Sequence, residues 1–312
     1  MALIEHLFYS VPMRAAYREE PCSTALNPVK GMGFGWSLNP YMGCAHRCAF
    51  CYVRGFERRA DRPSDDRYGT NIRVKTNVVE VLRHELARRS WRRETVAIGA
   101  ATDPYQPAEG RYRLTRGCIQ ALGAARTPLD IITRGPLIVR DVDVLADAAR
   151  RANVRVSISV ATLDEGLGAR LEPGVAPPRQ RLRAIRILTD AGIAAGVALA
   201  PVLPGLTDAP AGLAAVLRAA REAGATHAWS NILNLRAGTR EHFLTVLERE
   251  WPAELERYRR LYPAGGSGYL ARADASPIER RLAAVRRGSG IGDRRRIVIA
   301  PEPEPSQLAL PF

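Results

Sequence analysis

Three cysteines, Cys44, Cys48 and Cys51, lie within eight consecutive residues. Thiolates this close in the chain are typical of a loop that binds a soft metal centre. Structural zinc sites close at four ligands, whereas an iron–sulfur cluster held by only three cysteines leaves one iron free for an outside ligand. The spacing therefore favours an open iron–sulfur site and leaves a zinc site with a fourth ligand as the alternative.

The zinc alternative needs His46 or Cys22 as that fourth ligand. His46 lies inside the loop, where backbone geometry makes binding together with its neighbours awkward, and Cys22 is distant in the chain. Of the five cysteines, Cys22 and Cys118 show no disulfide pattern, which fits a reducing compartment.

Phe50 directly precedes the third cysteine and completes a C-x3-C-x-aromatic-C pattern. This pattern resembles that of the radical S-adenosylmethionine (radical SAM) superfamily, and residues 36–54 resemble its branch containing spore photoproduct lyase and uncharacterised bacterial relatives. The resemblance implies that Cys44, Cys48 and Cys51 ligate a [4Fe–4S] cluster and that S-adenosylmethionine chelates the open iron. An external electron donor would then drive its cleavage to methionine and a 5′-deoxyadenosyl radical for hydrogen abstraction.

Polar residues follow the predicted second and third strands and supply further candidates. Thr102 and Asp103 occupy the place of the superfamily's Gly-Gly-Glu element, which holds the methionine ammonium, and both offer acceptors for it. Arg134 is expected to pair with the methionine carboxylate as a bidentate fork. Spore photoproduct lyase has a cysteine hydrogen donor on the second-strand turn where this chain has alanine, so its reaction is not carried over. Tyr105 is named as a candidate catalytic radical relay.

The remaining cofactor contacts are implied by the same resemblance. Backbone near Phe50 and Tyr52, and again near Ala200, would meet the adenine. Ser159 alternates with Ser157 on one face of the fourth strand, so its hydroxyl is expected to turn toward a ribose inside a barrel, with backbone partners as the alternative.

Short apolar segments separated by room for helices must position these residues. They lie at 37–41, 96–100, 129–133, 154–161, 194–200 and 226–232. This alternation predicts an α/β fold with a parallel sheet. A doubly wound sheet is one form of it, and the resemblance implies the other, a partial (β/α)6 TIM barrel of the radical SAM type with a helical C-terminal extension. In such a barrel the chemistry collects at the carboxyl ends of the strands.

The expected domain organisation follows from these patterns. Residues 1–36 are expected to be an irregular N-terminal leader and residues 37–235 the barrel, with a capping box at Asn77–Glu80 that begins a helix. Residues 236–292 form a basic helical extension, with helices predicted over 241–262 and around 278–287. Residues 293–312 are expected to be an extended, proline-rich tail.

Composition narrows the class of protein. Lys and Arg number 46 against 32 Asp and Glu, which gives a net charge of +14 and favours a nucleic-acid partner. The sequence has no long apolar run and no signal-peptide pattern, so we expect a cytoplasmic protein with no membrane partner. The leading hypothesis is a hydrogen-abstracting, lyase-like radical SAM enzyme in DNA repair or modification. The alternatives are radical modification of a peptide or small molecule, and a non-catalytic, metal-bearing nucleic-acid-binding protein.

The last six residues form a separate motif. Gln307, Leu308, Leu310 and Phe312 resemble the short peptide by which bacterial repair and replication proteins bind the sliding DNA clamp. A few apolar anchors and one polar group that fixes the register suffice for such a peptide to bind a preformed groove. The sliding clamp is therefore an expected partner, and a tail folded back on the barrel is the alternative.

Overall fold

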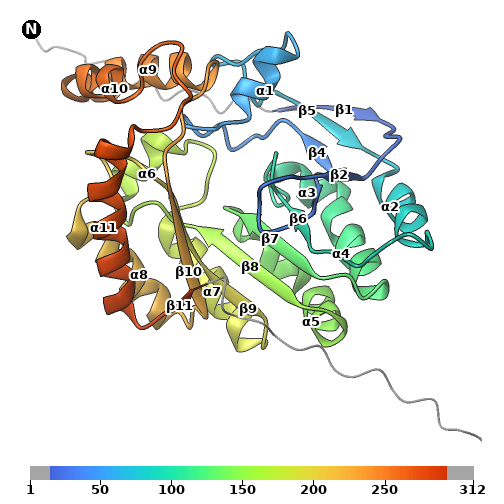
Figure 1. Cartoon of the computed structure of the whole chain (residues 1–312). Helices are drawn as coiled ribbons and strands as arrows, with labels where there is room; N and C mark the ends of the chain where they lie inside the picture. The colour runs from blue at the N-terminus through green and yellow to red at the C-terminus, as the bar shows by residue number, and fades with distance from the viewer. Residues whose placement is uncertain (1–14, 294–312) are drawn as a thin grey trace, which may run out of the picture.

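The computed structural model describes residues 15–293, and its larger sheet contains six parallel strands in chain order (Figure 1). These strands are β3 (Trp36–Leu38), β6 (Val96–Ile98), β7 (Leu129–Thr133), β8 (Val154–Ser159), β9 (Ala194–Val202) and β10 (His227–Ile232). The sheet is extended by β2 (Leu26–Pro28), antiparallel to β3, and by β11 (Gly292–Asp293), parallel to β10. Because the strand order never reverses, the winding is that of a partial barrel, which confirms the predicted fold class and excludes the doubly wound sheet.

Helices between consecutive strands cover the outer face of the sheet (Figure 1). They are α2 (Val78–Leu86), α4 (Leu114–Ala124), α5 (Val142–Arg151), α7 (Pro178–Asp190) and α8 (Pro210–Glu222). Each presents an apolar stripe to the strands; in α5, Val144, Leu145 and Ala148 are buried while Arg150 and Arg151 end the helix. Shorter helices, α3 (Pro107–Tyr112) and α6 (Glu165–Leu171), lie on the loops after β6 and β8.

The concave face of the sheet is partly polar. Trp229 Nε1 on β10 donates to Ser157 Oγ on β8 at 2.9 Å, although β9 separates these two strands. Ser157 Oγ also lies 3.2 Å from Nε2 of the buried His227. A contact that skips one strand shows that Ser157 points to the inside of the curved sheet, as the alternation in β8 predicted.

A smaller sheet frames the cysteine loop, in the order β1 (Ala16–Glu20), β5 (Asn71–Lys75), β4 (Tyr41–Met42). The prediction that residues 1–36 are irregular is therefore wrong for the segments that form β1 and β2. The strands that pair with them, β5 and β3, lie further along the chain, so residues 1–36 alone carry no sign of the pairing. The capping box is also wrong. The Asn77 side chain instead accepts from Cys22 N at 2.8 Å and donates to Cys22 O at 3.1 Å.

The C-terminal extension contains α9 (Thr239–Glu250), a short 3₁₀ turn (Pro252–Glu254), α10 (Leu255–Leu261) and α11 (Arg272–Ser289), as the sequence predicted. Phe243 of α9 and Tyr258 of α10 are fully buried and share one apolar cluster with Cys48 and Phe50 of the cysteine loop. No helix within residues 15–293 is long and apolar enough to cross a membrane. The clamp-like peptide at 307–312 lies outside the described residues, and the four domain boundaries stay predictions.

Candidate functional site

The three cysteines line one pocket at the carboxyl ends of the strands. The loop that carries them runs from β4 to α1 (Arg54–Arg59), and the end of β6 forms the facing wall with Gly99, Thr102 and Asp103. The pocket contains about 480 Å³ of space between atoms, part of it open to solvent.

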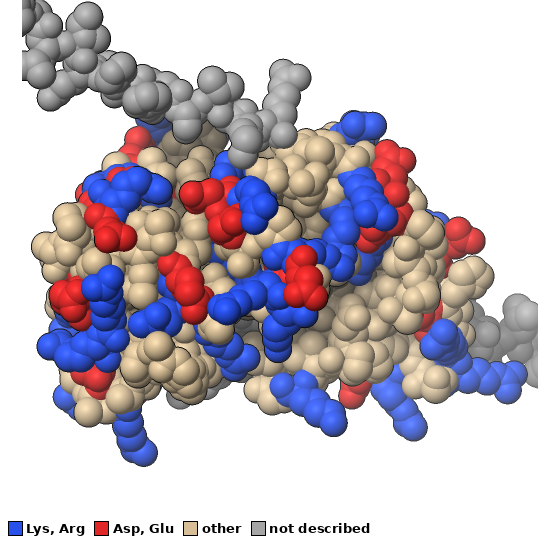
Figure 2. All heavy atoms as spheres, turned by 90° about the horizontal axis from the view of Figure 1, so that it is seen from above, with Lys and Arg blue, Asp and Glu red and all other residues tan. Residues whose placement is uncertain are grey.

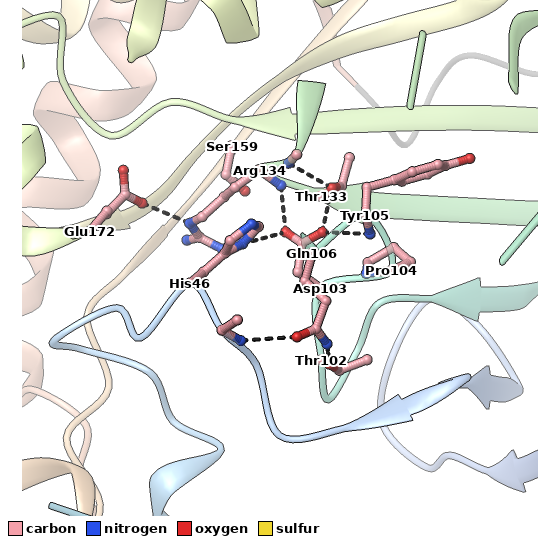
Figure 3. Close-up of polar contacts among 12 residues, drawn as sticks. His46, Thr102, Asp103, Pro104, Tyr105, Gln106, Thr133, Arg134, Ser159 and Glu172 are labelled. Atoms are coloured by element: carbon pink, nitrogen blue, oxygen red, sulfur yellow. Dashed lines mark hydrogen bonds and ion pairs between the residues drawn. The ribbon is translucent and has the colours of Figure 1, made fainter. Parts of the chain in front are cut away.

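A buried glutamine fixes the backbone around Cys44. Gln106 has no exposed surface, and its Oε1 accepts from Ala45 N at 2.9 Å (Figure 3). Its Nε2 donates to Gly43 O at 3.1 Å. Nε2 also donates to Thr102 Oγ1 at 2.9 Å, and the Thr102 hydroxyl donates to Gly43 O at 2.6 Å. The turn after β6 therefore holds the residues on both sides of the first cysteine.

Asp103 connects this turn to the third strand and to the cysteine loop. Its carboxylate accepts from Tyr105 N at 2.9 Å, Thr133 Oγ1 at 2.6 Å and Arg134 N at 2.7 Å, and lies 3.3 Å from His46 Nδ1 (Figure 3). Burial would raise the pKa of Asp103, but His46 and these hydrogen bonds lower it to about 2. Burial would lower the pKa of His46, but the Asp103 carboxylate, with Cys44, raises it to about 10.

A buried ion-pair triad lies beside the second cysteine. Glu172, at the end of α6, accepts from Arg134 Nε at 2.7 Å and lies 2.9 Å from Arg181 Nη1. Burial would raise the pKa of Glu172, but the two arginines lower it. Arg134 Nη2 donates to the Ala200 carbonyl at 2.7 Å, and its guanidinium lies 5.5 Å from the Phe50 ring centre.

The cysteines themselves lie in a mostly apolar environment. Burial raises the pKa of Cys48 well above its ordinary value, against the opposing effect of Arg134, and burial raises the pKa of Cys51. Cys51 Sγ lies 3.4 Å from Tyr68 Oη, and the Cys51 carbonyl accepts from Thr239 Oγ1 at 3.0 Å. Buried thiols of this kind hold their protons until a metal displaces them.

The structure brings most of the predicted residues together, although no observation tests their roles. Arg134 and Tyr52 line the pocket with the cysteines, Thr102 and Asp103, while Phe50 lies beneath Arg134. The Ser159 hydroxyl is buried at the end of β8 and has no hydrogen-bond partner among residues 15–293. Tyr105 is not brought to the pocket: its ring is 2% exposed, packs in the main core and points away from His46 and Arg134 (Figure 3).

The structure does not place either of the two predicted fourth zinc ligands, His46 and Cys22, as a ligand beside the three cysteines. His46 Nδ1 faces Asp103, and Cys22 is held against Asn77 at the start of α2. Residues 15–293 contain no group of three His, Cys, Asp or Glu side chains placed to hold a single metal ion.

Sequence reasoning missed four side chains that support the loop: His46 as an Asp103 partner, Gln106, Glu172 and Tyr68. Gln106 stands in the polar run after β6 and could have been found there; Glu172 and Tyr68 carry no local signal.

Three comparisons with known proteins bear on this site. The family model described as the radical SAM superfamily matches residues 38–217. An uncharacterised protein of Mycobacterium tuberculosis is 44% identical over 252 residues, 80% of this chain and 74% of the relative. An uncharacterised protein of Methanocaldococcus jannaschii is 25% identical over 183 residues, 59% of this chain and 66% of that relative.

Among solved structures, spore photoproduct lyase has the same fold. A mutant with bound AdoMet and dinucleoside spore photoproduct gives a TM-score of 0.67 at 17% identity, covering 89% of this chain and 80% of that one. The lyase complexed with dinucleoside spore photoproduct gives 0.67 at 15% identity, with the same coverage.

Proposed function

This chain belongs to the radical SAM superfamily, which implies S-adenosylmethionine and an iron–sulfur cluster, and we propose that it binds a [4Fe–4S] cluster through Cys44, Cys48 and Cys51 and abstracts hydrogen from a nucleic acid. When bound, the cluster and S-adenosylmethionine supply the 5′-deoxyadenosyl radical. The part of the protein is to hold these groups, orient them and keep water away.

The residues present fit these groups. Three soft thiol donors on one loop suit iron and leave one iron open. The orphaned Ser159 Oγ is a buried polar atom in need of a partner, which a ribose hydroxyl would provide. Arg134 uses Nε and Nη2 within the protein, and Nη1 has no hydrogen bond to the described residues, so it can donate to a carboxylate.

Asp103 suits the methionine ammonium less directly than the sequence suggested. Three protein donors and His46 already occupy its two oxygens. We propose that Asp103 acts mainly by fixing Arg134 and His46 at the pocket, because both contact its Oδ2, while a bound ammonium would share the negative charge of the carboxylate.

One observation carries the proposal: Cys44, Cys48 and Cys51 line the same pocket as Arg134 and Thr102, at the strand ends where barrel enzymes place their chemistry. Anaerobic purification followed by iron and sulfide analysis tests the cluster. About four irons and four sulfides per chain are expected for this cluster type. A colourless protein with one zinc per chain would contradict it.

Two exposed aromatic side chains, Tyr52 and Phe56, form what we call the aromatic ledge, and they support nucleic acid as the substrate. Tyr52 lines the pocket and is 46% exposed, and its ring meets Phe56, 40% exposed, edge to face at 5.8 Å. The Arg59 guanidinium lies 4.9 Å from the Phe56 ring centre. Exposed aromatic rings beside arginine are a stacking surface for bases with a cation for phosphate.

The charge gives more diffuse support. Figure 2, which looks down on α1, α9 and α10, shows Lys and Arg side chains in several groups, most of them beside acidic side chains. The net charge of +14 is thus not gathered into one basic surface on this face. The ledge therefore supports the nucleic-acid substrate more specifically than the net charge does.

The substrate class is tested by adding DNA, RNA or peptide to the reduced enzyme and measuring 5′-deoxyadenosine. A rise with DNA is expected, and a rise with peptide alone would favour the second enzyme hypothesis. A cluster-replete chain that binds DNA and forms no 5′-deoxyadenosine would favour the non-catalytic binder.

A further inference from the structure

Arg54 is a fully buried cation next to the cysteine loop. Its side chain is 1% exposed, and it follows the third cysteine by three residues. Burying a charged group costs several kcal/mol unless an opposite charge compensates it. A compensating negative charge is therefore expected close to Arg54.

The guanidinium is satisfied by backbone oxygens alone. Nη1 donates to Ser64 O at 2.9 Å and Asp65 O at 2.6 Å. Nε lies 3.5 Å from Cys48 O, and Nη2 lies 3.4 Å from Arg47 O. These bonds tie the loop to the segment before β5, but carbonyl groups carry no net charge.

Arg54 forms no ion pair with a carboxylate of residues 15–293. Asp65, whose carbonyl it contacts, places its carboxylate 2.8 Å from Arg67 instead. Tyr68 also contacts the cation: its ring centre lies 4.6 Å from the Arg54 guanidinium, and its hydroxyl lies 3.4 Å from Cys51 Sγ. Among the side chains that act electrostatically on Arg54, Cys51 has the largest effect, and the Asp66 carboxylate has a smaller one. The positive charge therefore lies next to the Cys48 carbonyl and is linked to Cys51 Sγ through the side chain of Tyr68.

We propose that Arg54 is the internal counter-charge of the iron–sulfur cluster and sets its reduction potential. This inference rests on the proposed cluster site. No described carboxylate forms an ion pair with Arg54, whereas three cysteine thiolates would give the loop a negative charge, and reduction of the cluster would add one more near the buried cation. A positive charge in a water-poor environment favours the reduced state. Arg54 does not line the pocket, so we assign it a positioning and tuning role.

The test compares Arg54→Gln and Arg54→Lys with the wild-type chain by anaerobic redox titration of the cluster, followed by electron paramagnetic resonance. Arg54→Gln is expected to lower the equilibrium constant for one-electron reduction about tenfold, a shift of about 59 mV to lower potential. Arg54→Lys keeps the charge and loses most of the backbone bonds, so its potential is expected to stay near the wild-type value. Arg155→Gln removes a partly buried arginine bonded to Asp130 at 2.7 Å, at the amino end of β8, and serves as the control with unchanged potential.

The outcomes separate charge from structure. An unchanged potential in Arg54→Gln overturns the inference, as does an equal shift in Arg54→Lys, which would assign only a structural role. If Arg54→Gln does not retain iron, iron content decides: retention by Arg54→Lys supports the counter-charge, and equal loss in both variants overturns it. A wild-type chain without a cluster would instead overturn the proposed function, and the inference with it.

Discussion

The side-chain oxygen of Gln106 accepts a 2.9 Å hydrogen bond from the backbone N–H of Ala45, across 61 residues of sequence. This bond, with the one from Gln106 Nε2 to Gly43 O, places the backbone on both sides of Cys44 under the control of the turn after β6. The cysteine loop is therefore held by the barrel and does not depend only on a bound metal for its shape.

Replacing Gln106 with Leu should destabilise the loop. The change leaves the Ala45 N–H without its side-chain partner in a partly buried place, and an unsatisfied group of this kind costs about 1 to 3 kcal/mol, while Gly43 O keeps the bond from the Thr102 hydroxyl. We expect the free energy of unfolding to fall by about 1 to 3 kcal/mol and the iron content to fall with it. Gln180→Leu, on the exposed side of α7, is the matched control for urea unfolding. Equal stability of the two variants would show that Gln106 does not brace the loop.

The triad around Glu172 makes a second prediction. Glu172→Gln would leave the buried Arg181 and the partly buried Arg134 without their shared carboxylate. Breaking a buried pair in this way costs about 3 to 5 kcal/mol, measured as the loss in free energy of unfolding at pH 7. Because the pKa of Glu172 is lowered in the folded chain, its contribution is present above the unfolded value of about 4.3 and is lost as the pH falls through the folded pKa. The gap between the wild type and Glu172→Gln should therefore shrink below about pH 4; a gap that stays constant into acid would contradict it.

The sequence alone predicts the strands and the cysteine loop of this protein better than it predicts the side chains that support the loop. β7 lies at residues 129–133, where the sequence pattern placed it, because a buried parallel strand is rich in apolar residues, here Leu129, Ile131 and Ile132. The cysteine spacing likewise identified the loop. The supports of that loop were harder to find, because Gln106 and Glu172 act over 61 and 38 residues. Gln106 at least stands in the polar run after β6, whereas nothing in the immediate neighbourhood of Glu172 marks it. Tyr105 was misplaced for a related reason: a tyrosine in a polar run can turn its ring into the core.

Removing one ring of the aromatic ledge should weaken nucleic-acid binding. Phe56→Ala takes away a surface worth about 1 to 3 kcal/mol per stacked base, so we expect the dissociation constant for single-stranded DNA to rise about tenfold. Phe56 does not line the pocket, so 5′-deoxyadenosine formed without substrate should stay unchanged. Tyr269→Ala is the control, since Tyr269 is 60% exposed, lies 5.6 Å from the Arg236 guanidinium and is not part of the pocket lining. Similar losses in both variants, or none in Phe56→Ala, would rule out the ledge as a specific site.

The last six residues make an independent prediction. The peptide containing Gln307, Leu308, Leu310 and Phe312 should bind the bacterial sliding clamp through its apolar anchors. A titration with purified clamp should show binding by the intact chain and none after deletion of residues 307–312. Replacement of Leu308 and Phe312 by Ala should act like the deletion, while Gln307→Glu tests the polar contact. Binding that survives the deletion, or no binding by the intact chain, would remove the clamp as a partner.

The central claim is that the three-cysteine pocket cleaves S-adenosylmethionine reductively, and one measurement tests it most directly. The anaerobically purified chain is reduced with dithionite in the presence of S-adenosylmethionine, and 5′-deoxyadenosine is quantified beside the same reaction with Cys48→Ala. We predict that the wild type forms 5′-deoxyadenosine and methionine in equal amounts while Cys48→Ala forms none and has lost the visible absorption of the cluster. A cluster-replete wild type that forms no 5′-deoxyadenosine, or a Cys48→Ala chain that forms as much as the wild type, would contradict the account.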